Sequence, residues 1–353
     1  MVALEWAAVS ATALANNEDQ SVPSSDSPKS SPYMRRMMWL AAFIVFLVAG
    51  WTAFWFWAAG ELESRVQAGI AAMNADGRVN CENLVVNGYP FRLGLSCSSL
   101  VAEKASEGFS MSAGALRTAA QIYAPAHVVG ELDGPLRLET PLLQPLDISY
   151  GNLRASVRLG LPMPSRISAE IRQMKAALRD GEDILSAEAA EAHARQDKGN
   201  LDVSARFEGL VLAEVLSEGR TIPALTGEAD GSIADGAAWL AGPRKSLRGL
   251  KGDLRALRLS PAPDASVAAA GPWSVDATGL LDADIQVTLN NPPVLSKILA
   301  TAFPEDAQQI RDVFAALSAM TAPDKPGAVI PLRVIKGEAF FGILPLGVVP
   351  PLP

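Results

Sequence analysis

The uncharged stretch Met37–Ala59 constrains the fold most, because it is apolar throughout and long enough to cross a membrane. A helix of about 20 apolar residues spans the hydrocarbon core of a bilayer. Trp55 and Trp57 lie near the C-terminal end of the stretch, where amphipathic rings favour the headgroup level. We therefore predict a transmembrane signal-anchor helix over residues 37–60, through which the chain contacts the lipid bilayer.

The charges on either side of this stretch predict its orientation. Arg35 and Arg36 precede it, whereas Glu61 and Glu63 follow it. Basic flanks stay on the cytoplasmic side, so we expect a single-pass inner-membrane protein with a cytoplasmic N-terminus and a periplasmic main domain. A cleaved signal peptide is one alternative, but a secretory apolar core has only about 7–15 residues and ends at small side chains. A buried helix of a soluble protein is the other alternative.

Three regions follow from this assignment. Residues 1–36 include the Ser- and Pro-rich stretch SVPSSDSPKSSP and are predicted to be a disordered cytoplasmic tail. Met34 is a second plausible start, so the alternative is a misassigned start with the true one near residue 34. Residues 61–353 are predicted to form a β-rich periplasmic domain, after a helical continuation over Glu61–Met73.

Alternating patterns predict the fold class of the outer region. Apolar and polar residues alternate over 153–159, 201–207 and 281–289, as in antiparallel strands with one face buried. Asp180-Gly181 and Asp230-Gly231 are typical of the turns between strands. The prediction is a mainly β fold, in which a single N-terminal transmembrane helix precedes an extended, curved antiparallel sheet with a few covering helices.

Two segments of the outer region carry a helical pattern. Pro292 and Pro304 each open an apolar stretch with helical spacing, and this pair is expected to cover the apolar face of the sheet. Ser165–Arg179 fits either a helix or a strand. The neighbouring strands favour a strand there.

Cys81 and Cys97 are the two cysteines of the chain. They flank Asn87-Gly88, a strong hairpin signal, and a loop over Asn87–Phe91 would place the two cysteines opposite each other. Opposed residues of an antiparallel pair can meet disulfide geometry, so we predict a structural disulfide. A redox-active pair and a zinc site are the alternatives. The spacing is far from Cys-x-x-Cys, and no basic residue or histidine is adjacent to lower a thiol pKa.

The segment from Cys81 to Cys97, with the core sequence VNGYPFRL, resembles the hallmark of a bacterial family called domain of unknown function 2125. Weaker similarities follow at Ile122–Leu138 and Leu332–Gly347. The resemblance covers roughly residues 61–352. It implies a membrane-anchored envelope protein that is rich in β-structure, and it supplies no catalytic residues.

The sequence carries no recognisable catalytic machinery. His127 and His193 are its only histidines and lie far apart in unlike surroundings, which argues against a histidine-based catalyst or metal site. No nucleophile elbow, phosphate-binding loop or dinucleotide-binding fingerprint is present. The formal net charge of −8 argues against a nucleic-acid partner. We predict no enzymatic activity, no catalytic residue, no cofactor and no metal.

Two functions remain for the outer domain. The first is a non-enzymatic envelope protein that shelters or transfers lipid along an apolar groove of the sheet. The candidate groove residues, together with Ala205, are Val203, Phe207, Ile285, Val287 and Leu289. The alternative is a structural or assembly factor that binds another envelope protein through a sheet edge or through its C-terminal tail.

Overall fold

The computed structural model describes residues 32–74, 77–141, 143–160, 163–242, 246–319, 327–342 and 344–352. Contacts between Cα atoms divide the chain into two units, with the boundary between Ala53 and Phe54. The sheet belongs to the second unit, together with the part of helix α1 that begins at Phe54.

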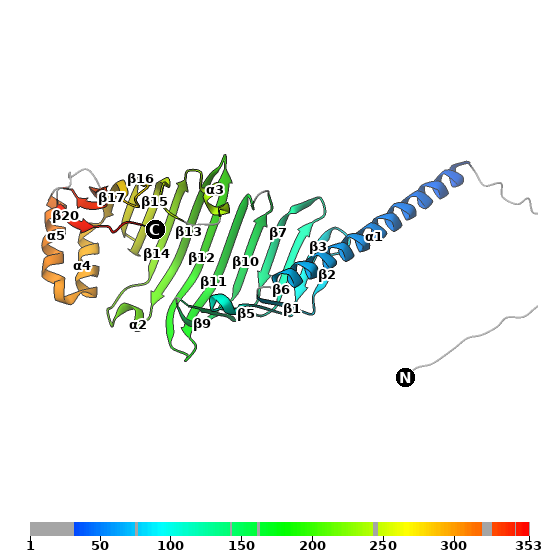
Figure 1. Ribbon diagram of the computed structural model, residues 1–353, viewed down its shortest axis with the longest axis horizontal. Helices are drawn as coiled ribbons and strands as arrows, with labels where there is room; N and C mark the ends of the chain where they lie inside the picture. The colour runs from blue at the N-terminus through cyan, green and yellow to red at the C-terminus, as the bar shows by residue number, and fades with distance from the viewer. Residues whose placement is uncertain are drawn as a thin grey trace, which may run out of the picture. The chain divides into compact units, whose positions relative to one another are not determined.

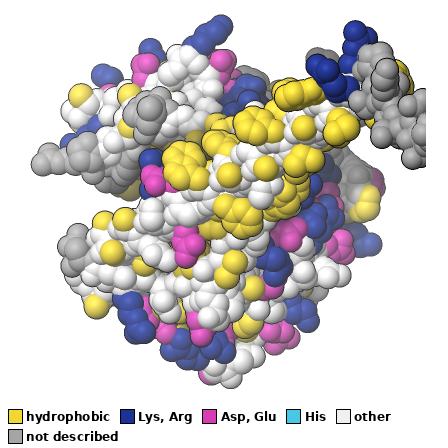
Figure 2. Space-filling view, turned by 90° about the vertical axis from the view of Figure 1, so that its right-hand side faces the viewer, with side chains coloured by type: hydrophobic (Ala, Val, Ile, Leu, Met, Phe, Trp, Pro, Cys, Tyr) yellow, Lys and Arg dark blue, Asp and Glu magenta, His cyan; other side chains and the backbone are white. Residues whose placement is uncertain are grey.

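Helix α1 covers Pro32–Met73. It is about twice as long as a membrane crossing requires, which confirms the predicted helical continuation over Glu61–Met73. Among the described residues it is the one helix long and apolar enough to span a membrane. Most of its large apolar side chains between Tyr33 and Trp57 are exposed, as Figure 2 shows in yellow, whereas Trp55 is buried. The helix already begins at Pro32, so residues 32–36 do not belong to a disordered tail. Residues 1–31 lie outside the described ones.

In the part of the chain that the structure describes, twenty antiparallel strands form one sheet that does not close into a barrel, which confirms the predicted fold class. The sheet forks at β11 (Arg166–Leu178), because this long strand pairs with two shorter strands along one of its edges. Residues Arg166–Arg172 pair with β10, and Lys175–Leu178 pair with β9. The other edge of β11 pairs with β12.

Two arms therefore lead from β11 toward the N-terminal strands. The first arm contains, in spatial order, β10 (Asn152–Arg158), β7 (Ala124–Leu132), β6 (Leu116–Gln121), β3 (Arg92–Cys97) and β2 (Val85–Asn87). The second arm contains β9 (Leu143–Ser149), β8 (Leu136–Thr140), β5 (Phe109–Ala113), β4 (Ser99–Lys104) and β1 (Arg78–Glu82). A short 3₁₀ helix, η1 (Ala105–Glu107), joins β4 to β5.

Beyond β11 the strands follow one another in chain order and stand side by side in Figure 1. They are β12 (Asp183–Asp197), β13 (Asn200–Leu212), β14 (Leu225–Ile233), β15 (Lys251–Ala262), β16 (Ala265–Val275), β17 (Leu281–Asn290), β18 (Gly327–Ile335), β19 (Glu338–Phe341) and β20 (Leu344–Val348). The strand at Ser165–Arg179 and the turn at Asp180-Gly181 are confirmed.

Helices α4 (Pro292–Ala302) and α5 (Ala307–Ala319) cover the C-terminal end of the sheet near β17 (Figure 1). The 3₁₀ turn η2 (Pro304–Asp306) separates them. Leu295 of α4 packs with residues of β16, β17 and β18 in the main buried cluster. The predicted helical pair and its covering role are thus confirmed. Two shorter helices, α2 (Glu214–Ser217) and α3 (Gly236–Ala241), lie against the middle strands.

Two local predictions were wrong. The hairpin of β2 and β3 pairs Val86 with Leu95 and not with Arg92, so Cys81 does not lie opposite Cys97. The chain bends between β1 and β2, where Asn83 has a positive φ, and β1 pairs with β4 instead. Asp230-Gly231 does not form a turn: it lies within β14, where the pairing with β15 shifts by a bulge.

Candidate functional site

The pairing register lines up small side chains across the middle of the sheet. Directly paired residues of antiparallel strands share a face, so each row of pairs lies on one side. One row contains only alanine over five consecutive strands: Ala155 of β10, Ala169 of β11, Ala192 of β12, Ala205 of β13 and Ala229 of β14. Because these methyl groups are short, the sheet surface is low along this row.

Two further apolar rows flank the alanine row on the same face, with larger side chains on β10, β11 and β13 and alanine again on β12. On one side run Leu153, Ile171, Ala190 and Phe207, and on the other run Val157, Ile167, Ala194 and Val203. A low row between two rows that are taller on β10, β11 and β13 forms a groove that runs across the strands.

The hollow of this groove is a cavity of about 490 Å³. Its lining begins with Ile167 on β11 and reaches Leu254 on β15 and Trp273 on β16. Six strands about 4.8 Å apart give it a length of roughly 24 Å. The volume lies within the range of about 300–1,000 Å³ that is usual for small-molecule sites. We call this feature the apolar groove.

The five predicted groove residues divide between an open and a covered part of the sheet. Val203 lines the apolar groove and is 39% exposed. Phe207 lies on the same face, and its ring covers Gly227 of the neighbouring strand. Ile285 and Leu289 of β17 are buried, and Val287 packs against the cluster beneath α4 and α5. The structure thus places two of the five residues in or beside the open part.

Sequence reasoning missed most of the groove lining. Ala169, Ala192 and Ala229 line the cavity, as does Trp273. Alanine is weakly apolar, and it has no strand preference, so the alternation along β12 gives little signal. The alternation of alanine with Glu191 and His193 over residues 190–194 is the pattern that could have revealed this lining.

The opposite face of the same strands is charged. Arg154, Glu170, Glu191, Arg206 and Glu228 form one row there, from β10 to β14. The Nε atom of Arg154 lies 2.8 Å from an oxygen of Glu131 on β7. The sheet therefore has one face suited to water and one suited to an apolar ligand.

A tighter charge cluster joins four strands on this polar face. Asp202 of β13 accepts a hydrogen bond from Arg195 of β12 at 2.8 Å and one from Arg255 of β15 at 2.9 Å. Arg255 also pairs with Asp230 of β14. The hydrogen bonds from Arg195 and Arg255 lower the pKa of Asp202 below its ordinary value. The cluster fastens strands β12 to β15 behind the apolar groove.

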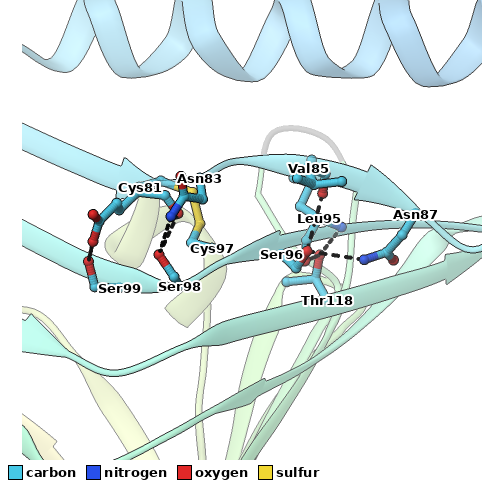
Figure 3. Close-up of a disulfide and its surroundings, with 11 residues drawn as sticks. Cys81, Asn83, Val85, Asn87, Leu95, Ser96, Cys97, Ser98, Ser99 and Thr118 are labelled. Carbon is cyan, nitrogen blue, oxygen red and sulfur yellow. Dashed lines mark hydrogen bonds between the residues drawn. A yellow bond between two sulfur atoms is a disulfide. The ribbon is translucent and has the colours of Figure 1, made fainter.

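Cys81 and Cys97 form a disulfide, with their Cα atoms 5.3 Å apart (Figure 3). Cys81 lies on β1 and Cys97 on β3, two strands that do not pair with each other. The bond therefore joins the two arms near their ends, because β1 is the last strand of the second arm and β3 is the last but one of the first. Beside it, Asn83 donates a hydrogen bond to the hydroxyl of Ser98 at 3.0 Å.

Among the described residues, no group of three or more His, Cys, Asp and Glu side chains is placed to hold a metal ion. His127 and His193 lie on β7 and β12, with β10 and β11 between them. The imidazole of His193 lies 3.7 Å from the carboxylate of Glu191 on the polar face. The structure does not bring the two histidines together.

Fold and groove define a class of protein with one long apolar N-terminal helix and a large open antiparallel sheet whose apolar face is partly uncovered. The chain belongs to the bacterial family domain of unknown function 2125, described as an uncharacterized protein conserved in bacteria, whose sequence pattern matches residues 55–350. A comparison with curated proteins found no match. The matched region begins at the C-terminal part of α1 and takes in every strand of the sheet.

Proposed function

We propose that this protein is a non-enzymatic component of the bacterial cell envelope that shelters or transfers lipid along the apolar groove. Residues 37–60 anchor it in the inner membrane, and the main domain lies in the periplasm. The observation that supports the proposal most is the groove, which is open and lined mainly by small and larger apolar side chains along about 24 Å. An acyl chain spans about half of a 30 Å hydrocarbon core, so this length accommodates one.

The chemistry of the groove favours an apolar chain over a polar metabolite. Apart from backbone groups, its floor and sides offer methyl and larger hydrocarbon surfaces, whereas the charged rows lie on the opposite face. Each methylene group that leaves water for such a surface contributes about 0.8 kcal/mol. A headgroup at the edge of the sheet would remain in water.

Val203→Asp tests the proposal in the full-length protein. The carboxylate can reach water from this open position, so the variant should fold but carry less lipid per mole of protein than the wild type. Lipid is measured by mass spectrometry of the detergent-extracted protein. The matched control is Val129→Asp: Val129 is 45% exposed, but it pairs with Ser156 and so lies on the polar face. A control variant with an unchanged lipid content shows that a new carboxylate alone has no effect.

A second function has a separate observation in its favour. Strand β20 ends the sheet, its side chains are exposed, and Leu346 and Val348 are among the exposed large apolar residues. An exposed apolar edge strand can pair with a strand of another protein. If Val203→Asp folds with its lipid content unchanged, the lipid proposal fails. A structural or assembly role, in which β20 binds an envelope partner, is then favoured.

A further inference from the structure

Four exposed aromatic side chains gather at one edge of the sheet. Phe56 of α1 is 63% exposed, and Tyr89 and Phe91 of the β2–β3 turn are 48% and 63% exposed. Tyr123 of the β6–β7 turn is 78% exposed. We call these four residues the aromatic patch. Rings of this size are costly to leave in water, because each can bury about 150–250 Å².

Specific contacts hold the β2–β3 turn against the helix. The indole Nε1–H of Trp55 donates a hydrogen bond to the backbone carbonyl of Arg92 at 2.8 Å. The ring of Trp55 meets that of Tyr89 edge to face at 5.5 Å between centroids. The ring of Phe56 stacks on that of Tyr89 at 6.1 Å between centroids. Trp55 is itself buried against the turn. Its role is to fix the turn beside the helix.

The two turns are also joined to each other. The backbone N–H of Ile122, next to Tyr123, donates to the carbonyl of Phe91 at 3.1 Å. The pairing of Arg92 with Gln121 continues this link into β3 and β6. The helix and both turns therefore present their aromatic side chains from one connected surface.

The structure points to one occupant for this surface. Phe56 and Trp57 belong to the apolar stretch 37–60, so a bilayer crossed by that stretch has its headgroup level at this part of α1. Amphipathic rings such as Tyr and Trp favour that level, with the ring body in an apolar and the polar tip in a wet environment. A turn held against the helix at the same position meets the same layer.

We propose that the aromatic patch rests in the headgroup layer of the membrane that α1 crosses, so that the β3–β6–β7 end of the sheet contacts the bilayer directly. This inference rests on the proposed anchoring by residues 37–60, but not on lipid occupancy of the groove. The groove-facing rows begin at the same end: Val157 pairs with Val128 of β7, which pairs with Ala120 of β6. The apolar face therefore starts beside the membrane surface.

Spin labels on single introduced cysteines in the full-length protein test the inference in vesicles of phosphatidylethanolamine and phosphatidylglycerol. Phe91→Cys and Tyr123→Cys each place a label in one of the two turns while the native cysteines remain in their disulfide. Val215→Cys is the matched control. It is an exposed apolar residue on α2, which follows the C-terminal end of β13. The two turns lie at the other ends of the strands. Ile44→Cys reports on the apolar stretch itself.

The measured quantity is the collision rate of each label with oxygen, which concentrates in lipid, relative to a water-soluble nickel complex. At Phe91 and Tyr123 we expect a ratio severalfold higher than at Val215 and lower than at Ile44. Equal ratios at Phe91, Tyr123 and Val215, with a high ratio at Ile44, would overturn the aromatic-patch inference alone. A low ratio at Ile44 as well would overturn the anchoring on which it rests. The two turns are read independently, so one misfolded variant does not leave the question open.

Discussion

Removing the disulfide tests how far the link between the two arms stabilises the sheet. The perturbation is the double substitution of Cys81→Ala and Cys97→Ala, which leaves no unpaired thiol. A crosslink restricts the unfolded chain according to the length of the closed loop, and the sequence separation here is 16 residues. The loop-entropy relation then gives an entropy difference of about 10 cal/mol/K. We expect the free energy of unfolding to fall by about 3 kcal/mol at 25 °C.

The assay is urea unfolding of the full-length, detergent-solubilised protein, followed by circular dichroism. With a slope of about 3 kcal/mol/M, the midpoint should fall by about 1 M urea. Hydrogen exchange should increase most in β1 and β3, which carry the two cysteines. Ser98→Ala serves as the control beside the bond, because its hydroxyl is exposed and its hydrogen bonds go to Asn83 and to the backbone carbonyl of Glu82, close to the crosslink.

Two results would refute the reasoning. An unchanged midpoint in the double variant would show that the link does not restrain the unfolded chain as calculated. Reaction of both native thiols with maleimide, without a reductant and in cells whose thiols are trapped at lysis, would contradict the disulfide itself. It would also remove an argument for the periplasm, because disulfides persist in oxidising compartments.

Two further predictions concern the core and the charge cluster. Leu295→Ala should lower the free energy of unfolding by about 3–5 kcal/mol, because Leu295 of α4 is 2% exposed where the helix packs on the sheet. Leu257→Ala, at a site 44% exposed on the open face, should cost less than about 1.5 kcal/mol in the same urea assay. Equal costs would contradict the division between covered and open parts. Because the pKa of Asp202 is lower in the folded than in the unfolded state, its ionised carboxylate stabilises the fold at neutral pH. This stability is lost as the pH falls from about 5, through the unfolded-state pKa near 3.9, to the folded-state pKa. Asp202→Asn lacks this contribution at every pH, so its free energy of unfolding should differ most from that of the wild type at pH 7, and the difference should narrow on acidification. A difference that widens would refute the stabilising role of the Asp202 carboxylate.

Local patterns in the sequence were enough to identify the elements with strong periodicity. The apolar stretch predicted α1, and the alternation over 281–289 predicted β17. The two prolines at 292 and 304 marked the helical pair. These features depend on neighbouring residues of one segment, and such short-range constraints can be read without knowing the partner of each strand.

The partners themselves were decided by the tertiary structure. The hairpin signal at Asn87-Gly88 was correct, yet its register was wrong, because Cys81 belongs to a strand that pairs elsewhere. Likewise, Asp230-Gly231 resembles a turn locally, but pairing on both sides keeps it within β14. Hydrogen bonds to two neighbouring strands outweighed the turn preference of the dipeptide.

The sequence by itself determined that both β13 and β17 have one apolar and one polar face, because successive side chains of a strand point to opposite sides. It could not determine which apolar faces remain open. Val203 and Val287 have the same pattern around them, yet Val203 lines the groove and Val287 packs against the cluster beneath α4 and α5. Only the tertiary structure made this distinction, since a strand's own residues fix the direction of a side chain but not which distant segment covers it.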